Sequence, residues 1–215
     1  MKRCIVLSGG PVSDYDQVSL CTMPDDFIVA CDAGYLAAQH FGLKPDLLVG
    51  DFDSYHGEVD PGVEVLTVPA KKNDTDTLLG IKIGLENGCR EFIIVGGFGG
   101  RLDHTIANLQ VLSFLCEQGA QGMILANDNR AWAIRDSEIT IPRLENYHIS
   151  VFAWGDTCTG VTLAQLAYPL TDYTLTPTFP LGISNEFTED TAKISVKQGT
   201  LLIIASKEST VSGHC

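Results

Sequence analysis

Residues 46–54 read DLLVGDFDS, in which a short apolar run typical of a buried strand ends in two aspartates. Side chains two residues apart in an extended chain point the same way, so we expect Asp51 and Asp53 to face one point while Phe52 turns into the core. Two carboxylates on one side suit a hard cation such as Mg2+. The same residues also suit a polar turn after a strand, because Asp and Ser bond readily to nearby backbone groups.

A second acidic cluster follows at residues 73–76, which read NDTD. Apolar residues then recur at helical spacing from 78 to 85, and Gly88 is a typical stop, so the pattern predicts a helix here. Asp74 and Asp76 stand at its start, where one of them can cap the helix and complement its dipole. Two such acidic clusters at the starts of two successive loops also suit the rim of a phosphate and metal site, with Asp74 and Asp76 as candidate metal ligands.

Three further apolar runs, at residues 4–7, 27–30 and 92–95, end in loops rich in glycine or aspartate. With residues 46–50 they make four units of strand, loop and helix. The last helix is predicted from the spacing of Ile106, Leu109, Leu112 and Cys116. Such units predict an α/β fold with a parallel sheet and helices on both faces, and these folds bind ligands at the carboxyl ends of their strands.

The loop at residues 96–104 reads GGFGGRLDH and departs from both common nucleotide-binding loops. Leu102 stands where the dinucleotide pattern G-x-G-x-x-G requires its third glycine, and the chain contains no G-K-[ST]. We expect Arg101 to grip phosphate oxygens, since a guanidinium binds them in a bidentate manner. Asp103 suits either the N-cap of the next helix or the site itself, and His104 suits a helix start better than a general base.

Taken in order, these segments resemble the thiamine pyrophosphokinase family over nearly the whole chain. The family pattern A-D-G-G, P-D-x-x-x-G-D-F-D-S, T-D, G-x-x-G-G-R-x-D-H-x-x-x-N and G-x-S-N is similar to residues 31–34, 45–54, 75–76, 96–108 and 182–185. Ala33 replaces a usual glycine, and Asn73 stands where a further aspartate is common. The second departure leaves open which residue of 73–76 contacts metal, and Asp76 is favoured.

The resemblance implies transfer of a pyrophosphoryl group from ATP to thiamine, giving thiamine diphosphate and AMP. Mg2+ would be held by Asp51, Asp53 and Asp76, with Asp74 as a further candidate, and Arg101 would steady the transferred group. Arg101 and Asp103 complete the predicted catalytic set. We predict contacts to ATP from Gly9, Gly10, Asp32, Gly34, Lys72, Gly99, Gly100 and His104.

The C-terminal part has a different pattern, because segments such as 149–153 and 193–196 alternate apolar and polar residues and no helical spacing follows about residue 132. We therefore predict an α/β domain over residues 1–128 and a small β-sandwich over residues 129–215. The resemblance implies that the second domain holds thiamine and that two chains form a homodimer whose cleft is shared between subunits. The candidate thiamine contacts are Tyr168, Ser184, Asn185 and Phe187, although an aromatic residue in a β domain is usually core.

Composition limits the partners. A net charge of -13 over 215 residues argues against nucleic acid and anionic membranes. Seven cysteines without a C-x-x-C pair indicate neither a zinc site nor a disulfide framework, so a cytoplasmic location is expected. The N-terminal apolar run is too short for a secretory signal, and no run approaches the roughly 20 residues of a transmembrane helix.

Three alternative functions share parts of this pattern. A pyrophosphokinase for a hydroxymethylpterin would need the same phosphate machinery, and residues 184–185 favour thiamine over it. A haloacid-dehalogenase-like phosphatase would carry its D-x-D at the end of the first strand, whereas here the motif follows at least two strands. A non-catalytic sensor of thiamine or nucleotide would be expected to lose the acidic residues, which are present.

Overall fold

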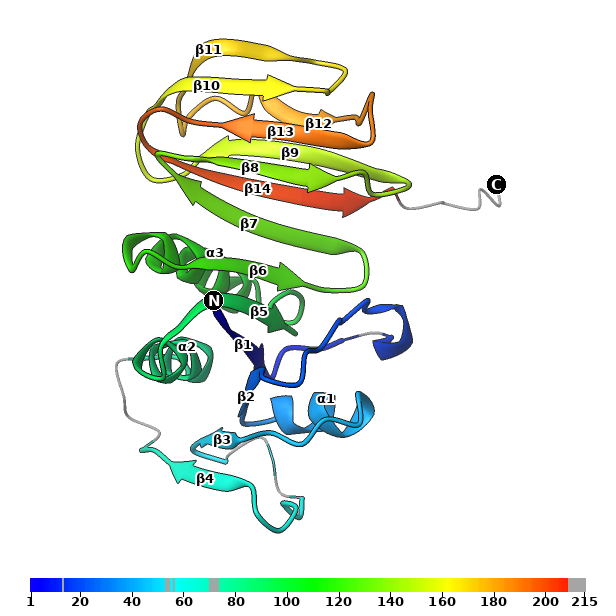
Figure 1. Cartoon of the computed structure of the whole chain (residues 1–215), viewed down its shortest axis with the longest axis vertical. Helices are drawn as coiled ribbons and strands as arrows, with labels where there is room; N and C mark the ends of the chain where they lie inside the picture. The colour runs from blue at the N-terminus through cyan, green and yellow to red at the C-terminus, as the bar shows by residue number, and fades with distance from the viewer. Residues whose placement is uncertain (13, 53–54, 56, 70–73, 209–215) are drawn as a thin grey trace. The chain divides into compact units, whose positions relative to one another are not determined.

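The computed structural model describes the chain apart from residues 13, 53–54, 56, 70–73 and 209–215. The chain divides into two compact units, Met1–Asn127 and Asp128–Cys215 (Figure 1). The first unit alternates strands and helices, and the second is built from strands. The predicted order of an α/β part followed by an all-β part is therefore confirmed. In the described ranges, no helix combines the length and the apolar character needed to cross a membrane.

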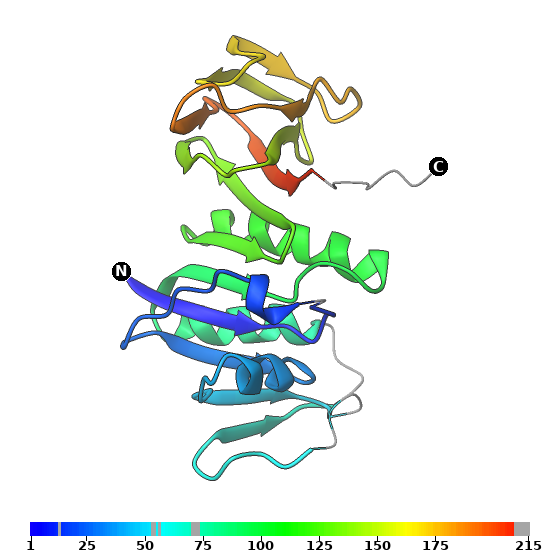
Figure 2. The same ribbon diagram turned by 90° about the vertical axis from the view of Figure 1, so that its right-hand side faces the viewer.

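The first unit is built on a parallel sheet in the order β6-β5-β1-β2-β3-β4. Its arrows all point the same way in Figure 2. The elements are β1 Lys2–Leu7, the 3-10 turn η1 Tyr15–Gln17, β2 Phe27–Cys31, α1 Gly34–His40, β3 Leu47–Gly50, β4 Glu64–Thr67, α2 Asp76–Glu86, β5 Cys89–Val95, α3 Leu102–Glu117 and β6 Gln121–Leu125. The four strands predicted from apolar runs are β1, β2, β3 and β5. The sequence did not predict the edge strand β4, whose four residues are all exposed.

Helices cover both faces of this sheet because successive residues of β1 are apolar and point to opposite sides. Ile5 and Leu7 pack with Ala38 of α1 on one face. On the other face, a Cβ added at Gly84 of α2 would lie 3.0 Å from the Sγ of Cys4. Glycine therefore allows α2 to lie close against the strands. The predicted parallel sheet between helices is confirmed.

The buried face of α3 differs from the predicted one. Leu109 and Leu112 are buried as expected, but Ile106 is 43% exposed and Cys116 is only partly buried. The helix instead turns a face toward the core that consists of Asn108, Leu109, Val111, Leu112 and Leu115. A run with apolar residues on several sides leaves the choice of face to packing, which spacing alone does not define.

The second unit consists of two antiparallel sheets, in the orders β12-β9-β14-β7 and β11-β10-β13-β8. Its strands are β7 Asn129–Arg135, β8 Glu138–Pro142, β9 Tyr147–Ala153, β10 Cys158–Ala164, β11 Leu170–Leu175, β12 Gly182–Asn185, β13 Thr191–Ser195 and β14 Thr200–Lys207. Val151 and Ile203 of the first sheet share one buried cluster with Val161 and Ile194 of the second. Inward-facing residues from both sheets thus form one core, and the predicted sandwich is confirmed.

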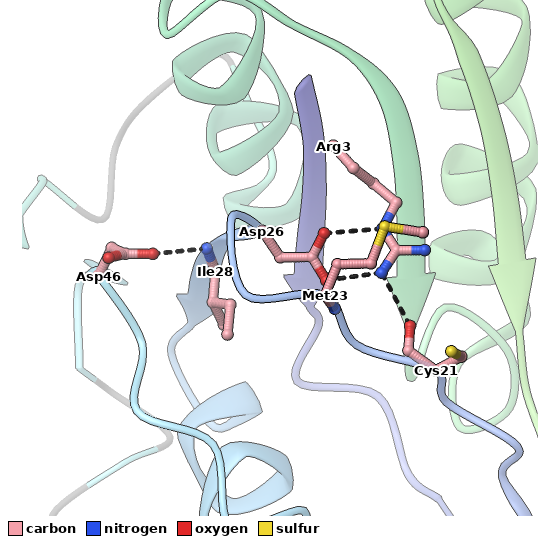
Figure 3. A network of polar contacts seen from close by, with 6 residues as sticks. All are labelled: Arg3, Cys21, Met23, Asp26, Ile28 and Asp46. Carbon is pink, nitrogen blue, oxygen red and sulfur yellow. Dashed lines mark hydrogen bonds and ion pairs between the residues drawn. The ribbon is translucent and has the colours of Figure 1, made fainter. Parts of the chain in front are cut away.

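A buried ion pair ties the start of β1 to the loop that leads into β2 (Figure 3). Arg3 donates from Nε and Nη2 to the two carboxylate oxygens of Asp26, at 2.8 and 2.6 Å, and from Nη2 to the carbonyl of Cys21. The side chains of Arg3 and Asp26 are only 8% and 2% exposed. Burial opposes ionisation of Asp26. The hydrogen bonds from Arg3 and from the N–H of Met23 outweigh it and lower the pKa of this carboxyl.

We expect Asp26→Asn to lower the free energy of unfolding by about 3 kcal/mol at pH 7, because it leaves a buried guanidinium without its countercharge. The folded pKa of Asp26 lies below that of an unfolded aspartate, about 3.9. The contribution of the carboxylate is therefore present above that value and is lost as the pH falls through the folded pKa. Urea unfolding from pH 7 to pH 3 should show the gap between wild type and variant closing below about pH 4.

The matched control is Asp172→Asn, since Asp172 pairs with Lys197 at 2.8 Å but its side chain is 62% exposed. This exposed pair should contribute less than about 1 kcal/mol. Equal losses for the two variants, or a gap for Asp26→Asn that does not change with pH, would contradict this account of the buried pair.

Candidate functional site

A cavity of 520 Å³ lies in the first unit at the carboxyl ends of β1, β2, β3 and β5 and at the starts of α2 and α3. This is the edge at which parallel sheets between helices bind ligands. Its lining consists of Ser8, Gly9, Gly10, Pro11, Cys31, Asp32, Ala33, Asp51, Asp74, Thr75, Asp76, Thr77, Gly99, Gly100, Arg101, His104, Ala107 and Asn108. Loops far apart in the sequence thus meet at one place.

Glycines let two of these loops lie in contact. A Cβ added at Gly10 would lie 2.1 Å from the carbonyl oxygen of Gly96, so the loops after β1 and β5 touch through their backbones. Backbone N–H groups in such loops are accessible to an anion because no side chain covers them. The predicted nucleotide contacts Gly9, Gly10, Asp32, Gly99, Gly100 and His104 all line the cavity. Lys72 lies outside the described residues.

Gly34 differs from the other predicted nucleotide contacts. It is the first residue of α1, it is buried, and it is not among the residues that line the cavity in the described part of the chain. A Cβ added there would lie 1.9 Å from the carbonyl oxygen of Leu7. The close packing of α1 against β1 explains this glycine without a ligand.

The backbone at Phe52, just after β3, is not extended, so the prediction of an extended chain there is wrong. Phe52 has φ +59°, in the left-handed region, where a bulky residue is rare. The extended backbone on which that prediction depended is therefore absent at Phe52, and Asp53 itself lies outside the described residues. Phe52 does turn inward, against a cluster that includes Tyr35 and Leu48. Strained conformations of this kind, which cost about 1–3 kcal/mol, concentrate at functional sites.

The two acidic segments contribute Asp51, Asp74 and Asp76 to one cavity. Thr75, not an aspartate, caps α2, because its side chain accepts a hydrogen bond from the N–H of Leu78 at 3.2 Å. Asp76 is the first residue of the helix. The carboxylate of Asp74 accepts a 2.6 Å hydrogen bond from Lys82. Lys82 therefore neutralises Asp74, while Asp76, the residue favoured by the sequence, lines the same cavity as Asp51.

The donor set fits Mg2+. Within the described residues there is no group of three or more His, Cys, Asp or Glu placed to hold a metal. Magnesium, however, is usually bound by one or two carboxylates together with water and substrate phosphates. Asp51 and Asp76 line the cavity that would take those phosphates. Their hard oxygen atoms suit this ion better than a softer transition metal.

Arg101 is the N-cap residue of α3, and Asp103 lies within the helix. Of the two alternatives for Asp103, the N-cap role is therefore wrong. Arg101 instead donates from Nε and Nη2 to the two carboxylate oxygens of Asp103, at 3.1 and 2.6 Å. These hydrogen bonds lower the pKa of Asp103 and raise that of Arg101. His104 lies in the first turn, as expected of a helix-start histidine, and its backbone N–H donates to Oδ1 of Asp103.

We expect Arg101→Ala to lower kcat/KM for ATP about tenfold or more, because the predicted charged hydrogen bond to phosphate would be lost. Arg101→Lys should recover only part of the loss, because an ammonium lacks the planar fork that Arg101 uses toward Asp103. Steady-state kinetics with varied ATP would test both variants. Unchanged kinetics for Arg101→Ala would make the residue a surface arginine. Arg135 of the second unit, whose side chain is 48% exposed, offers a control substitution to Ala.

Three buried polar residues of the cavity were not predicted as site residues: Ser8, Thr77 and Asn108. Asn108 donates from Nδ2 to the carbonyl of Gly97 at 2.9 Å. This bond holds the glycine-rich loop against α3. An asparagine beside the apolar residues of α3 was the available signal, because a buried amide requires a partner.

The four candidate thiamine contacts do not form one group. Tyr168 is 68% exposed, and Asn185 is buried. Both line a cavity of 300 Å³ in the second unit. Phe187 is a buried core residue and lines a different cavity, of 260 Å³. Among the residues the structure describes, Ser184 belongs to the lining of neither cavity.

The amide of Asn185 has a structural function in addition to any contact with a ligand. Its Oδ1 accepts from the N–H of Tyr168 at 2.9 Å, and its Nδ2 donates to the carbonyl of Tyr168 at 2.8 Å. Oδ1 also accepts from the N–H of Glu186 at 3.0 Å. Asn185 therefore fixes the backbone that carries the exposed ring of Tyr168.

Two family models match this chain in succession. Residues 21–124 match the thiamin pyrophosphokinase catalytic domain, and residues 136–201 match the thiamin pyrophosphokinase vitamin B1 binding domain. A relative named thiamine pyrophosphokinase, from Bacillus subtilis (strain 168), is 27% identical over 214 residues, which are 97% of this chain and 100% of the relative.

Solved structures agree. The crystal structure of thiamine pyrophosphokinase from Bacillus subtilis superposes with a TM-score of 0.87 at 25% identity, over 97% of this chain and 100% of that chain. The crystal structure of thiamin pyrophosphokinase from Geobacillus thermodenitrificans gives a TM-score of 0.81 at 27% identity, over 98% and 99% of the two chains. Sequence motifs, fold and both domain matches agree, and the chain belongs to the thiamine pyrophosphokinase family.

Proposed function

We propose that this chain transfers a pyrophosphoryl group from ATP to the primary hydroxyl of thiamine in the 520 Å³ cavity of its first unit. Family membership makes it a thiamine diphosphokinase, a transferase that forms thiamine diphosphate and AMP. The observation that carries the proposal is the meeting of glycine-rich loops, two acidic segments and Arg101 around that cavity. The first unit would bind ATP, and the second unit would bind thiamine.

Mg2+ would be held by Asp51 and Asp76, with Asp74 restrained by Lys82. When bound, the ion neutralises charge on the phosphate oxygens. The N–H groups of the loops around Gly10 and Gly100 can bind the same oxygens, and the start of α2 directs its dipole toward them.

Positioning supplies most of the rate in such a reaction, because phosphoryl transfer requires little covalent chemistry from the protein. Arg101 can move its fork from Asp103 to the transferred group, since both side chains are exposed. The thiamine hydroxyl attacks the β-phosphorus, the bond to the α-phosphate oxygen breaks, and AMP leaves. A carboxylate at the same rim can accept the hydroxyl proton.

An assay of purified protein with thiamine, ATP and Mg2+, followed by separation of AMP from ADP, tests the reaction. Equal amounts of AMP and thiamine diphosphate are expected. ADP with thiamine monophosphate would show an ordinary kinase and refute the assignment. A parallel assay with a hydroxymethylpterin distinguishes the related pyrophosphokinase, and binding of either ligand without turnover would indicate a sensor.

The pyrophosphokinase is further proposed to act as a homodimer whose cleft is shared between subunits. Several large apolar side chains of the second unit support self-association because they are exposed: Tyr168 at 68%, Phe179 at 64% and Ile183 at 56%. The high net negative charge supports the accompanying proposal of no nucleic-acid or membrane partner. The seven cysteines without a C-x-x-C pair support the proposal of a cytoplasmic location.

Mixing two inactive variants tests the shared cleft. Asp51→Asn disables the ATP half, and Tyr168→Ala alters the thiamine half at an exposed side chain. A mixed dimer would have one cleft with both defects and one without any. With random exchange, half of the dimers are mixed, so roughly a quarter of wild-type activity should return. Verified subunit exchange without recovery would place the whole site in one chain.

A further inference from the structure

Two buried hydroxyl groups meet at the wall of the 520 Å³ cavity. Ser8 directly follows β1, and Thr77 is the second residue of α2. Their Oγ and Oγ1 atoms lie 2.8 Å apart. Ser8 is 7% exposed and Thr77 is 6% exposed, yet both line the cavity. The pair therefore joins the first glycine loop to the acidic start of α2.

Both hydroxyls are held in place by backbone packing. The N–H of Ser8 donates to the carbonyl of Val95 at 2.8 Å. A Cβ added at Gly96 would lie 2.7 Å from the carbonyl oxygen of Ser8, so that loop lies directly against it. Thr77 lies in a capped first turn, and its branched side chain has few rotamers. The cavity wall thus presents these oxygens in a defined position.

The two hydroxyl groups have one more proton to donate than the hydrogen bond between them uses. Two hydroxyls carry two protons, and the bond between Ser8 and Thr77 uses one of them. Within the described part of the chain, neither hydroxyl has another hydrogen-bond partner. One buried O–H of the pair therefore has no acceptor among the residues that the structure describes. A buried donor is normally satisfied, so a ligand oxygen in the cavity is the expected acceptor.

The surroundings indicate which oxygen this is. Gly9 and Gly10 follow Ser8 in the loop, and the start of α2 places its positive dipole end beside Thr77. Both features favour an anion. We propose that Ser8 and Thr77 form a phosphate-binding subsite, in which one hydroxyl donates to the other and the second donates to a phosphate oxygen of the nucleotide. The proposal rests on the proposed function, which places ATP in this cavity.

Calorimetric titration with a non-hydrolysable α,β-methylene analogue of ATP, in the presence of Mg2+, tests the subsite. The variant Ser8→Ala with Thr77→Val removes both hydroxyls at nearly constant volume. Its Kd should rise at least about tenfold, the change expected for loss of a hydrogen bond to a charged group. Inorganic tripolyphosphate should lose affinity to a similar degree, because the contact is to phosphate. Thr77→Ser should restore most of any affinity lost by Thr77→Val.

A purely structural function for the pair would leave affinity unchanged. Ser113→Ala is the matched control, because Ser113 of α3 also has a buried hydroxyl, with no partner among the described residues and outside the cavity. It should bind the analogue as wild type does. A folded double variant whose Kd stays within about twofold of wild type would overturn the subsite, since no charged contact would have been lost.

If the double variant does not fold, Ser8→Ala and Thr77→Val are titrated singly. At least one of them should then weaken binding about fivefold, because one hydroxyl contacts phosphate directly. Wild-type binding by both folded single variants would refute the subsite. If wild-type protein forms AMP but the variants bind the analogue as tightly as wild type, only the phosphate-binding subsite is refuted. If wild-type protein forms no AMP, the proposed function itself is refuted.

Discussion

Asp51→Asn is expected to lower kcat for thiamine diphosphate formation at least about a hundredfold while the protein remains folded. The substitution keeps the size of the side chain and removes its charge. Asp51 is the first residue after β3 and lines the cavity that would hold the nucleotide. Under the proposed function Asp51 would bind Mg2+, so its loss would remove charge stabilisation from the transition state. Steady-state kinetics and a thermal unfolding curve on the same preparation would test this.

Two comparisons define the result. Asp76→Asn should behave like Asp51→Asn, and a mild effect there would move the metal contact to Asp74. Asp172→Asn, at an exposed acid of the second unit, should leave kcat unchanged. Near-normal turnover by folded Asp51→Asn would remove this residue from the site. Both variants should also require more Mg2+ for half-maximal activity, because each would remove a proposed ligand of the ion.

Gly34→Ala is expected to lower the free energy of unfolding by about 3 kcal/mol or more. The added Cβ would lie 1.9 Å from the carbonyl oxygen and 2.6 Å from the carbonyl carbon of Leu7. Neither atom belongs to a flexible side chain, so β1 or α1 must shift. Helix propensity predicts the opposite sign, since alanine is favoured over glycine by up to about 1 kcal/mol. Urea unfolding at pH 7 measures the difference.

Gly42→Ala is the matched control for that substitution. Gly42 follows α1 with φ +62°, and a Cβ there would meet no atom within 4 Å. The control therefore isolates the cost of a left-handed residue, about 1 kcal/mol. If Gly34→Ala lowered the free energy of unfolding no more than Gly42→Ala does, α1 and β1 could move apart more easily than their close contact indicates.

Local patterns were sufficient for the order of the elements. Four apolar runs predicted β1, β2, β3 and β5, and the helical spacing before Gly88 predicted α2, because these signals depend on neighbours in the sequence. A parallel sheet then requires that its loops meet at one edge. The sequence therefore predicts a candidate site at that edge of the sheet.

The geometry of the side chains could not be predicted from the sequence, because it depends on contacts between residues that are distant along the chain. The left-handed φ of Phe52 arises where its ring packs with Tyr35 and Leu48. The buried face of α3 likewise depends on the strands beneath it. Spacing predicted Ile106 inside, whereas packing placed Val111 and Leu115 there.

The sequence by itself determined the α/β unit, the sandwich that follows it, and the family, because apolar periodicity and ordered motifs are written along the chain. Only the tertiary structure decided that Arg101 pairs with Asp103 and that Lys82 neutralises Asp74. It alone brought Ser8 and Thr77, 69 residues apart, into hydrogen-bond contact. Hydrogen bonds and ion pairs act over a few ångströms in space, so folding of the chain decides which partners meet.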